Sequence, residues 1–184
     1  MKLRAATLGD AAAIADVYAP YVAGSAVSFE TEPPSEDQIR GRMAECDGRY
    51  PWLAAADEEG RLLGYAYATA FRPRPAYRFA VETSVYLRAE GQGRGLGRRL
   101  YEPLLAILEA QGYAQAIAAI TLPNEASVAL HERLGFVPAG VYRRVGWKMG
   151  DWHDVGLWQR PLAAPTSRPA EPLPLAGALA ALGL

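Results

Sequence analysis

Apolar residues recur three or four positions apart in two parts of the chain, the spacing of a helix with one buried face. One run spans 14–22, and the other ends before Gly112, with apolar positions at Leu96, Leu100, Leu104, Ile107 and Leu108. A shorter helix is predicted after Ser35, and another between Asn124, a common N-cap residue, and Gly135, a stop signal. The pattern therefore predicts about four helices.

Apolar and aromatic segments bounded by turn residues alternate with these helices and predict strands. The predicted strands cover 3–7, 50–56, 61–71, 78–87, 116–121 and, as a strand pair, 136–159. The turn sequence DEEG makes a hairpin of the second and third strands, and the last pair turns around Gly146 to Gly150. Because hairpins stand at both ends of the alternation, we expect a mixed α/β sheet and not a fully parallel one.

The chain has 184 residues, of which 51% are hydrophobic and 21% are charged, a composition typical of one globular domain. We predict that this domain occupies residues 1–160. Residues 161–184 are dominated by Pro, Ala, Leu, Ser and Gly and show no periodicity, which predicts a disordered tail.

Charge and cysteine content argue against several classes of protein. The net charge of -1 indicates neither a nucleic-acid surface nor a polybasic contact with a membrane. Cys46 is the single cysteine, so no intramolecular disulfide can form, and we expect a cytoplasmic protein. Two histidines and one cysteine make no zinc site at any usual spacing, so no metal is expected.

The segment EGQGRGLGRR, at 90–99, concentrates glycine between a predicted strand and a predicted helix. Glycine is favoured where the chain bends sharply or approaches a ligand, and a helix N-terminus attracts phosphate through its unpaired N–H groups. The segment is not the dinucleotide fingerprint, because the sixth position from Gly91 is Leu96, and it is not a P-loop, because no Gly-Lys pair is present. It predicts a different pyrophosphate loop, with a loose surface turn as the alternative.

Gln92, Gly95 and Gly97 form the pattern Q-x-x-G-x-G, which resembles the acetyl-CoA pyrophosphate loop of the GNAT acyltransferase superfamily. The segment NEASVALHERLGF at 124–136 resembles the coenzyme-contacting helix of that superfamily. The segments VSFETEP, GYAYA, RPRPAYRFAVETSVYL, TLPNEAS and GDWHDVGLWQR are similar, in order and spacing, to the phosphinothricin and methionine sulfoximine N-acetyltransferases. The resemblance covers 3–160 and implies an α/β (α+β) fold, with a mixed, mostly antiparallel sheet splayed in the middle.

The resemblance also implies a set of residues that bind acetyl-CoA. The main chain of the strand before the glycine segment is expected to pair with the pantetheine arm, at Val85, Tyr86 and Leu87. The loop and the first helical turn are expected to hold the pyrophosphate, with Gly93, Arg94, Gly95, Leu96, Gly97 and Arg98. In the later helix, Asn124 and Ser127 are further candidates for the coenzyme.

Glu82 is the candidate general base, because acetyl transfer to an amine requires a group that takes the amine proton. Strand alternation places Glu82, Ser84 and Tyr86 on one face. A carboxylate in an apolar and aromatic strand is costly to bury unless it is paired or used. The resemblance also assigns the base role to Glu82, and a structural ion pair with Arg74 or Arg78 is the alternative.

His131 stands in the later helix, where many members of the wider superfamily carry a tyrosine that acts as the general acid. The narrower family has histidine there, as this chain does. An imidazole can donate a proton near neutral pH. His131 is therefore a candidate to protonate the leaving thiolate or to relay the amine proton, and a purely structural histidine is the alternative.

The segment FRPRPAY at 71–77 supplies cationic and hydroxyl groups on a proline-stiffened loop directly before the strand of Glu82. The family pattern favours Arg74 and Tyr77 as acceptor-binding residues, with Phe29 as a wall of the pocket. The resemblance implies a small amino acid or analogue as acceptor, direct transfer in a ternary complex, and a homodimer.

Two other functions are compatible with the same segments. A different amine or a protein N-terminus would keep the chemistry and change the acceptor. A coenzyme A-binding module without catalysis would lack the base, whereas Glu82 is present in this chain.

Overall fold

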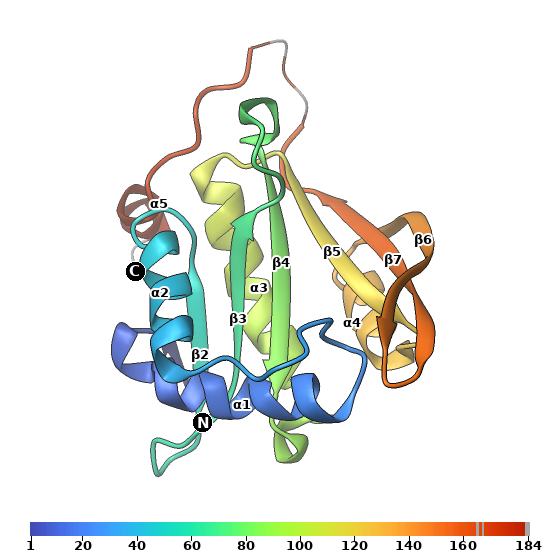
Figure 1. Ribbon diagram of the computed structural model, residues 1–184. Coiled ribbons are helices and arrows are strands. Elements are labelled where there is room, and N and C mark those ends of the chain that lie inside the picture. The colour runs from blue at the N-terminus through green and yellow to red at the C-terminus, as the bar shows by residue number, and fades with distance from the viewer. Residues whose placement is uncertain (165, 167, 183–184) are drawn as a thin grey trace.

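The computed structural model describes residues 1–164, 166 and 168–182, and in this part of the chain seven strands form one sheet. Across the sheet they follow the order β1 (Lys2–Ala5), β2 (Trp52–Ala56), β3 (Leu62–Ala70), β4 (Ala80–Leu87), β5 (Gln115–Leu122), β7 (Asp151–Pro161) and β6 (Val137–Lys148). Only the β4–β5 pair is parallel, and the other neighbours are antiparallel. The expected mixed, mostly antiparallel sheet is confirmed (Figure 1).

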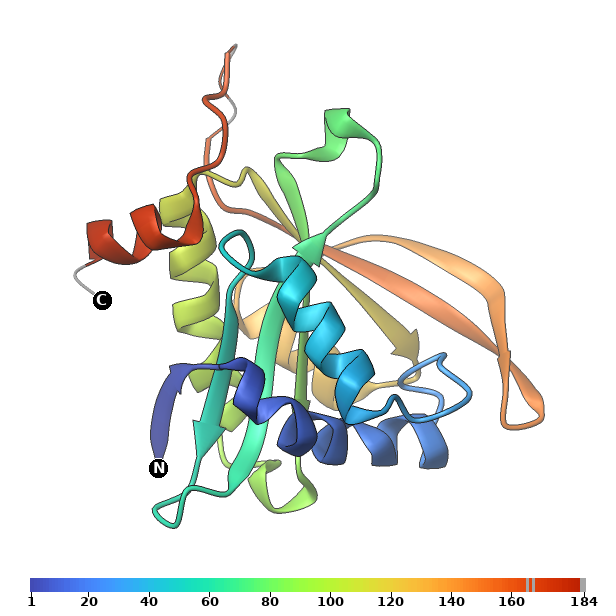
Figure 2. The same cartoon turned by 60° about the vertical axis from the view of Figure 1, so that its left-hand side comes forward.

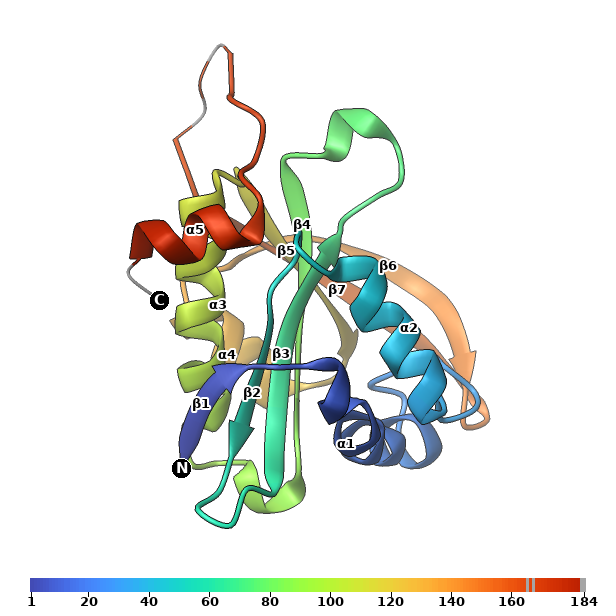
Figure 3. The same ribbon diagram turned by 90° about the vertical axis from the view of Figure 1, so that its left-hand side faces the viewer.

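Helices cover both faces of the sheet. Figure 3 shows α1 (Ala11–Gly24) and α2 (Glu36–Cys46) on one face, and α3 (Leu96–Gln111) and α4 (Glu125–Arg133) on the other. None of the helices in the described residues is long and apolar enough to cross a membrane.

Local signals in the sequence explain where these helices begin and end. The Ser35 hydroxyl accepts a hydrogen bond from the N–H of Gln38 at the start of α2, and the Asn124 side chain accepts one from the N–H of Ser127 at the start of α4. After α3, Gly112 adopts a φ of 87°, which glycine tolerates best. The predicted helix boundaries are therefore confirmed at these caps.

The core lies between the sheet and the helix faces that carry the apolar repeat. In α3, Leu100, Leu104 and Leu108 are fully buried, as the spacing predicts. On the opposite face, Ile14 and Val17 of α1 are buried against the sheet. Burying one such side chain contributes about 1.5–3 kcal/mol, so the two helical layers hold the strands in place.

The C-terminal segment departs from the expected disorder. Helix α5 (Leu175–Leu182) packs beside α3 (Figures 1 and 2), with Ala178 fully buried. The segment before it is fixed through its main chain: the Leu173 N–H donates to the Gln111 carbonyl at 2.7 Å, and the Gln111 amide donates to the Leu173 carbonyl at 3.0 Å. The prediction of a disordered tail is thus wrong for 175–182, while positions 165, 167, 183 and 184 lie outside the described residues.

The physical reason is the partner that this short apolar helix finds. Alanine and leucine are strong helix formers, but a short helix is marginal in water without packing. Composition alone cannot show that α3 offers a surface for it. The expected four helices become five among the described residues because of this tail helix.

Candidate active site

The main feature of the sheet is a gap between its two parallel strands. β4 and β5 pair only over three residues each, Ala80 to Glu82 with Gln115 to Ile117. Beyond Glu82, β4 stays paired with β3 and β5 stays paired with β7, so the two strands diverge (Figure 1). Beyond this point, the main-chain groups of β4 and β5 that face the gap can hydrogen-bond to an extended ligand instead of to a neighbouring strand.

The register of β3 and β4 determines which main-chain groups face this gap. The Arg88 N–H donates to the Leu63 carbonyl at 2.8 Å, and bonded and non-bonded pairs alternate along an antiparallel ladder. The main chain of Tyr86 therefore bonds toward β3, whereas those of Val85 and Leu87 face the gap. The register does not support the expected main-chain contact from Tyr86 to the coenzyme.

The hydroxyl of Tyr21 already contacts one of these positions. It donates to the Leu87 carbonyl at 2.6 Å and accepts from the Leu87 N–H at 3.3 Å. The side-chain amide of Gln92, the first residue of the Q-x-x-G-x-G pattern, donates to the same hydroxyl at 3.1 Å. Tyr21 thus links α1 to the end of β4 and to the glycine segment.

The glycine segment forms a turn that leads directly into α3. Gly93 and Gly95 have φ values of 68° and 75°, a region that other residues adopt at a cost. Gly97 lies in the first turn of α3, where an added Cβ would come within 3.0 Å of the Leu130 side chain of α4. The glycines therefore shape the loop and let the start of α3 approach α4.

Electrostatics at this loop favour an anion. Leu96 begins a helix of 16 residues, whose N-terminal N–H groups and dipole attract negative charge. Arg94 lies in the loop, and its guanidinium reaches the Glu90 carbonyl at 3.5 Å. Arg98 points along α3 and pairs with Glu102 at 2.7 Å, so its charge is already partly balanced.

Glu82 occupies the last paired position of β4 before the gap opens. Burial raises the pKa of its carboxyl, and the nearby positive charge of Arg72 lowers this pKa in part. Arg78, one of the arginines expected in a structural pair with Glu82, donates instead to Glu171 at 2.9 Å. A carboxylate with a raised pKa beside an open gap is suited to accept a proton.

His131 lies behind the gap on α4, and the residue is 3% exposed. Its Nδ1 is 2.8 Å from the Ser127 carbonyl oxygen, and its Nε2 is 2.9 Å from the hydroxyl of Tyr101 on α3. Burial lowers the pKa of His131, and the hydrogen bond to Ser127 offsets this in part. Asn124 and Ser127, at the start of the same helix, line a small cavity together with His131.

A model of the acetyltransferase (GNAT) domain family matches residues 3–157. The chain belongs to the GNAT acetyltransferase family. The sequence-based assignments of fold and enzyme class are thereby confirmed, because both the family and the splayed sheet agree with them.

Several GNAT relatives match the chain over most of its length. The phosphinothricin N-acetyltransferase of Streptomyces viridochromogenes is 42% identical over 174 residues, 94% of each chain. That of Alcaligenes faecalis is 46% identical, over 84% of this chain and 79% of the relative. The L-methionine sulfoximine/L-methionine sulfone acetyltransferase of Pseudomonas aeruginosa is 37% identical, over 91% of this chain and 98% of the relative.

A solved GNAT structure has the same fold. The phosphinothricin acetyltransferase of Sinorhizobium meliloti, crystallised in complex with AcCoA, superposes with a TM-score of 0.88 at 41% identity. The match covers 92% of this chain and 93% of that chain.

The three acceptor candidates of this GNAT chain lie in two separate surroundings. Arg74 and Tyr77 belong to the loop between β3 and β4, which projects beyond the end of the sheet in Figures 1, 2 and 3. Tyr77 is 42% exposed and rests edge-on against Phe71. Phe29 follows α1, and its ring packs directly on Gly146 of β6, where an added Cβ would overlap it. One chain therefore does not bring these side chains into a closed pocket.

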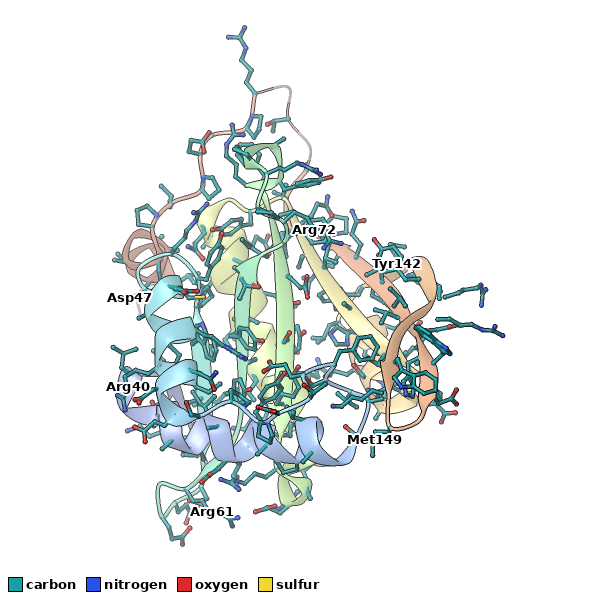
Figure 4. All side chains as sticks on the ribbon, in the orientation of Figure 1. Arg40, Asp47, Arg61, Arg72, Tyr142 and Met149 are labelled. Atoms are coloured by element: carbon teal, nitrogen blue, oxygen red, sulfur yellow. The ribbon has the colours of Figure 1, made fainter. Side chains whose placement is uncertain are left out.

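Three further residues belong to the site but were not assigned to it from the sequence. Tyr21 stands in the first apolar run, and Tyr101 directly follows Leu100 of the second, although their hydroxyls bond Leu87 and His131. Arg72 is recognisable as a loop cation, but its effect on Glu82 depends on the fold. Figure 4 shows Arg72 near the point where β4 begins.

The described residues contain no group of three or more His, Cys, Asp or Glu side chains able to hold a metal ion. In the final hairpin, His153 Nε2 lies 2.9 Å from the Lys148 carbonyl oxygen. Lys148 in turn donates its ammonium to the carbonyls of Val22 and Ser28. These contacts attach the hairpin to the segment that carries Phe29.

Proposed function

We propose that the protein transfers the acetyl group of acetyl-CoA to the α-amine of a small amino acid or analogue, of the phosphinothricin, methionine sulfoximine or methionine sulfone type. The observation that carries this proposal is the position of Glu82, half-buried at the mouth of the gap between β4 and β5. The names of the phosphinothricin and methionine sulfoximine relatives support the acceptor class.

The coenzyme is proposed to bind along the gap, from the glycine loop toward Glu82. The pyrophosphate is held by the N–H groups of the loop and of the first turn of α3, at Gly93, Arg94, Gly95, Leu96, Gly97 and Arg98. The pantetheine arm pairs with the main chain of Val85, and with that of Leu87 once the Tyr21 hydroxyl gives up its bonds. Asn124 and Ser127 line the opposite side of the gap.

Glu82 is proposed to act as the base within a ternary complex of enzyme, acetyl-CoA and acceptor. An amine attacks only when its lone pair is free, so a proton must leave it before or during attack. The raised pKa of Glu82 brings its basicity closer to that of the amine. With both substrates bound, Glu82 takes a proton from the amine nitrogen as the nitrogen attacks the thioester carbonyl.

The acceptor is proposed to contact Arg74 and Tyr77 through its carboxylate and second polar group, with Phe29 as an apolar wall. An arginine and a hydroxyl suit a carboxylate, since charge-assisted hydrogen bonds are the stronger ones. Because these residues stand on separate segments of one chain, acceptor binding requires the loop at 71–79 to fold back or a partner to close it.

The test is release of coenzyme A thiol from acetyl-CoA, measured with a panel of amines. We expect saturable turnover with phosphinothricin, methionine sulfoximine and methionine sulfone. Turnover only with other amines or with peptide N-termini would retain the chemistry and overturn the acceptor class. Tight binding of acetyl-CoA without turnover of any acceptor would favour a non-catalytic coenzyme-binding module.

The enzyme is also proposed to be a homodimer that forms through the β6 edge of the sheet. β6 is a long edge strand, and such strands attract a further strand unless they are covered. Figure 4 shows Tyr142 and Met149 on the outside of this hairpin. The exposed apolar side chains of β6 and its turn, each 46–63% exposed, are Val137, Val141, Tyr142, Val145, Trp147 and Met149.

A second copy fits this surface because a strand can pair with its own copy across a two-fold axis. Light scattering is expected to give the mass of a dimer, and Val145→Glu combined with Trp147→Glu is expected to give that of a monomer. Leu8→Glu, which changes an exposed leucine outside the hairpin, is the matched control. A monomeric wild-type protein at tens of micromolar would contradict the proposal.

The proposed setting is the cytoplasm. Cys46 is a free, buried thiol, and burial raises its pKa, so the reactive thiolate form is disfavoured. A single unreactive thiol fits a reducing compartment, in which no disulfide is needed for stability.

A further inference from the structure

The hydrogen bonds of His131 determine which of its ring nitrogens can exchange a proton. Nδ1 lies 2.8 Å from the carbonyl oxygen of Ser127, which can only accept a hydrogen bond. Nδ1 therefore carries a proton, and it keeps this proton whether the ring is neutral or charged. Nε2 is the nitrogen that gains and loses a proton.

Nε2 in turn faces a single group. Its hydrogen-bond partner within the described residues is the hydroxyl of Tyr101, at 2.9 Å, and the two rings meet edge to face with centroids 5.0 Å apart. A phenol hydroxyl both donates and accepts. It can donate to Nε2 of neutral His131, and it can accept from Nε2–H of the charged ring without changing place.

The same hydroxyl lies next to the gap between β4 and β5. It is 3.3 Å from the Thr83 hydroxyl on β4, one residue beyond Glu82. A cavity of about 50 Å³ opens there, lined among others by Thr83, Val85, Tyr101, Ser127 and His131. This volume is large enough for a water molecule, and a water bound there would connect the buried hydroxyl to the gap.

We propose that Tyr101 conducts protons between His131 and the gap, so that His131 acts on the acetyl transfer only through Tyr101. The proposal rests on the acetyltransferase function proposed above. Tyr101 remains a neutral phenol before and after each transfer, because every proton that leaves its oxygen is replaced by another in the same step.

The proton balance of the reaction provides a need for such a path. An ammonium acceptor has three protons on nitrogen and the amide product keeps one, so two must leave, while the departing thiolate must gain one. Glu82 accepts one of the two. The second proton leaves the ammonium nitrogen through Tyr101: the Tyr101 oxygen accepts a proton from the direction of the acceptor while its own O–H proton passes to Nε2 of His131. This step leaves His131 as an imidazolium and the acceptor as a free amine.

The return step protonates the leaving group. Once the nitrogen–carbon bond has formed and the carbon–sulfur bond breaks, Tyr101 gives its O–H proton to the thiolate and takes the Nε2 proton of the imidazolium. The products are the amide, the coenzyme A thiol and neutral His131. Glu82 then releases the remaining proton to water, and the cycle is complete.

The pKa shifts of His131 and Tyr101 agree with these directions of proton transfer. Burial lowers the pKa of His131, which favours a neutral ring at rest and a strong acid when it is charged. Burial raises the pKa of Tyr101, which disfavours a tyrosinate. Tyr101, from α3, is the titratable group that faces His131, and Tyr67 and Glu82, from β3 and β4, act through space on Tyr101.

The first experiment observes the wild-type protein without any substitution. The chain contains two histidines, and the Lys148 carbonyl next to His153 Nε2 fixes the proton of that ring on Nε2. Two-bond ¹H–¹⁵N NMR of ¹⁵N-histidine-labelled protein is expected to show opposite tautomers, with His131 protonated on Nδ1. His153→Gln assigns the signals. A His131 ring that is neutral with its proton on Nε2 would overturn the proposal.

The second experiment is a double-mutant cycle with Tyr101→Phe and His131→Asn. The asparagine side chain of the second variant retains an N–H toward the Ser127 carbonyl and lacks Nε2. We expect each single variant to lose about 100-fold in kcat, within the range for general acid–base groups. We expect the double variant to lose no more than either one, because both interrupt the same path. The Kd for acetyl-CoA should stay within about twofold.

Tyr113→Phe is the matched control, because Tyr113 is also a buried tyrosine but stacks on Tyr50, away from His131. This variant should keep wild-type kcat. Losses that multiply in the double variant, or a Tyr101→Phe enzyme with wild-type kcat, would overturn the relay while leaving the proposed function in place. A wild-type enzyme that turns over no amine would instead remove the proposed function itself.

Discussion

The two ends of the gap between β4 and β5 are built in different ways. At the glycine loop, the groups proposed to hold the coenzyme are main-chain N–H groups, fixed by the start of α3 and by two glycines with positive φ. The acceptor candidates are instead side chains, on the loop that projects beyond the other end and on the segment after α1. The first end is preorganised by the fold, whereas the second depends on side chains that one chain leaves exposed.

This difference indicates how a single scaffold serves many acceptors. A site made of main-chain groups changes little when side chains change, so coenzyme binding is retained. A site made of loop side chains can vary without cost to the sheet. Substitutions at the two ends should therefore affect separate kinetic constants, and the following predictions test this separation.

The largest effect is expected where the two ends meet, at Glu82. Glu82→Gln should lower kcat by about 10²–10⁴-fold, because the variant lacks the proton acceptor. Its affinity for acetyl-CoA should be almost unchanged, since the phosphates are proposed to bind at the far end of the gap. Steady-state kinetics and equilibrium binding of acetyl-CoA measure the two quantities. An unchanged kcat would remove Glu82 from the role of base.

The pH dependence of kcat/KM is a further test of Glu82 as the general base. Glu82 must be ionised to accept a proton, so kcat/KM should fall as the pH drops through the pKa of Glu82. Burial raises this pKa above the ordinary value of 4.5, and the acid limb should accordingly lie above pH 4.5. This limb should be absent from the residual activity of Glu82→Gln. If Glu82→Gln shows an acid limb at the same pH, a group other than Glu82 produces it.

The next largest effect is expected at the coenzyme end. Gly95→Ala places a Cβ on a residue with a φ of 75°, which costs about 1–2 kcal/mol and should weaken acetyl-CoA binding by about 5–30-fold. Gly60→Ala is the matched control, because Gly60 has a φ of 87° in the β2–β3 turn. Both variants should lose stability, but only Gly95→Ala should lose coenzyme affinity. Equal affinities would show that the loop does not hold the phosphates.

A comparable but separate effect is expected at the acceptor end. Arg74→Ala and Tyr77→Phe should each raise the KM for the acceptor, by at least about 10-fold for the arginine, since a charge-assisted hydrogen bond contributes about 1.5–3 kcal/mol. The KM for acetyl-CoA should not change. Arg40→Ala, which removes a partly exposed arginine of α2, is the control. An increase in the KM for acetyl-CoA would contradict the separation of the two ends.

The smallest effect is expected in the C-terminal segment. The Arg78–Glu171 pair is exposed on both sides, so Glu171→Gln should change the free energy of unfolding by less than about 1 kcal/mol. Gln111→Leu should cost more, about 1–3 kcal/mol, because it removes two buried hydrogen bonds, to the carbonyls of Arg49 and Leu173. Urea denaturation measures both. The reverse order would mean that the ion pair contributes more to stability than the hydrogen bonds of the Gln111 side chain.

Local signals made much of the fold predictable from the sequence. The caps at Ser35 and Asn124, the stop at Gly112 and the hairpin turn after β2 all depend on a few adjacent residues, and the structure has them as expected. The glycine loop could be located for the same reason, since strand, loop and helix are consecutive in the chain.

The remaining features depend on contacts between distant residues. The Tyr21 hydroxyl reaches Leu87, 66 positions away, and the bond between Tyr101 and His131 joins two helices. A tyrosine at an apolar-repeat position shows that its ring is buried, but not what its hydroxyl meets. The tail helix α5 likewise depends on the surface of α3, which composition cannot reveal.

The contact between Phe29 and Gly146 has a consequence for changing the acceptor by mutation. An added Cβ at position 146 would lie 2.1 Å from the Phe29 ring, so any side chain there must push the ring aside. Phe29 is the residue that we propose as a wall for the acceptor. A library aimed at new substrates can therefore reshape that wall from position 146, on a strand far away in the sequence, without altering any residue of the wall itself.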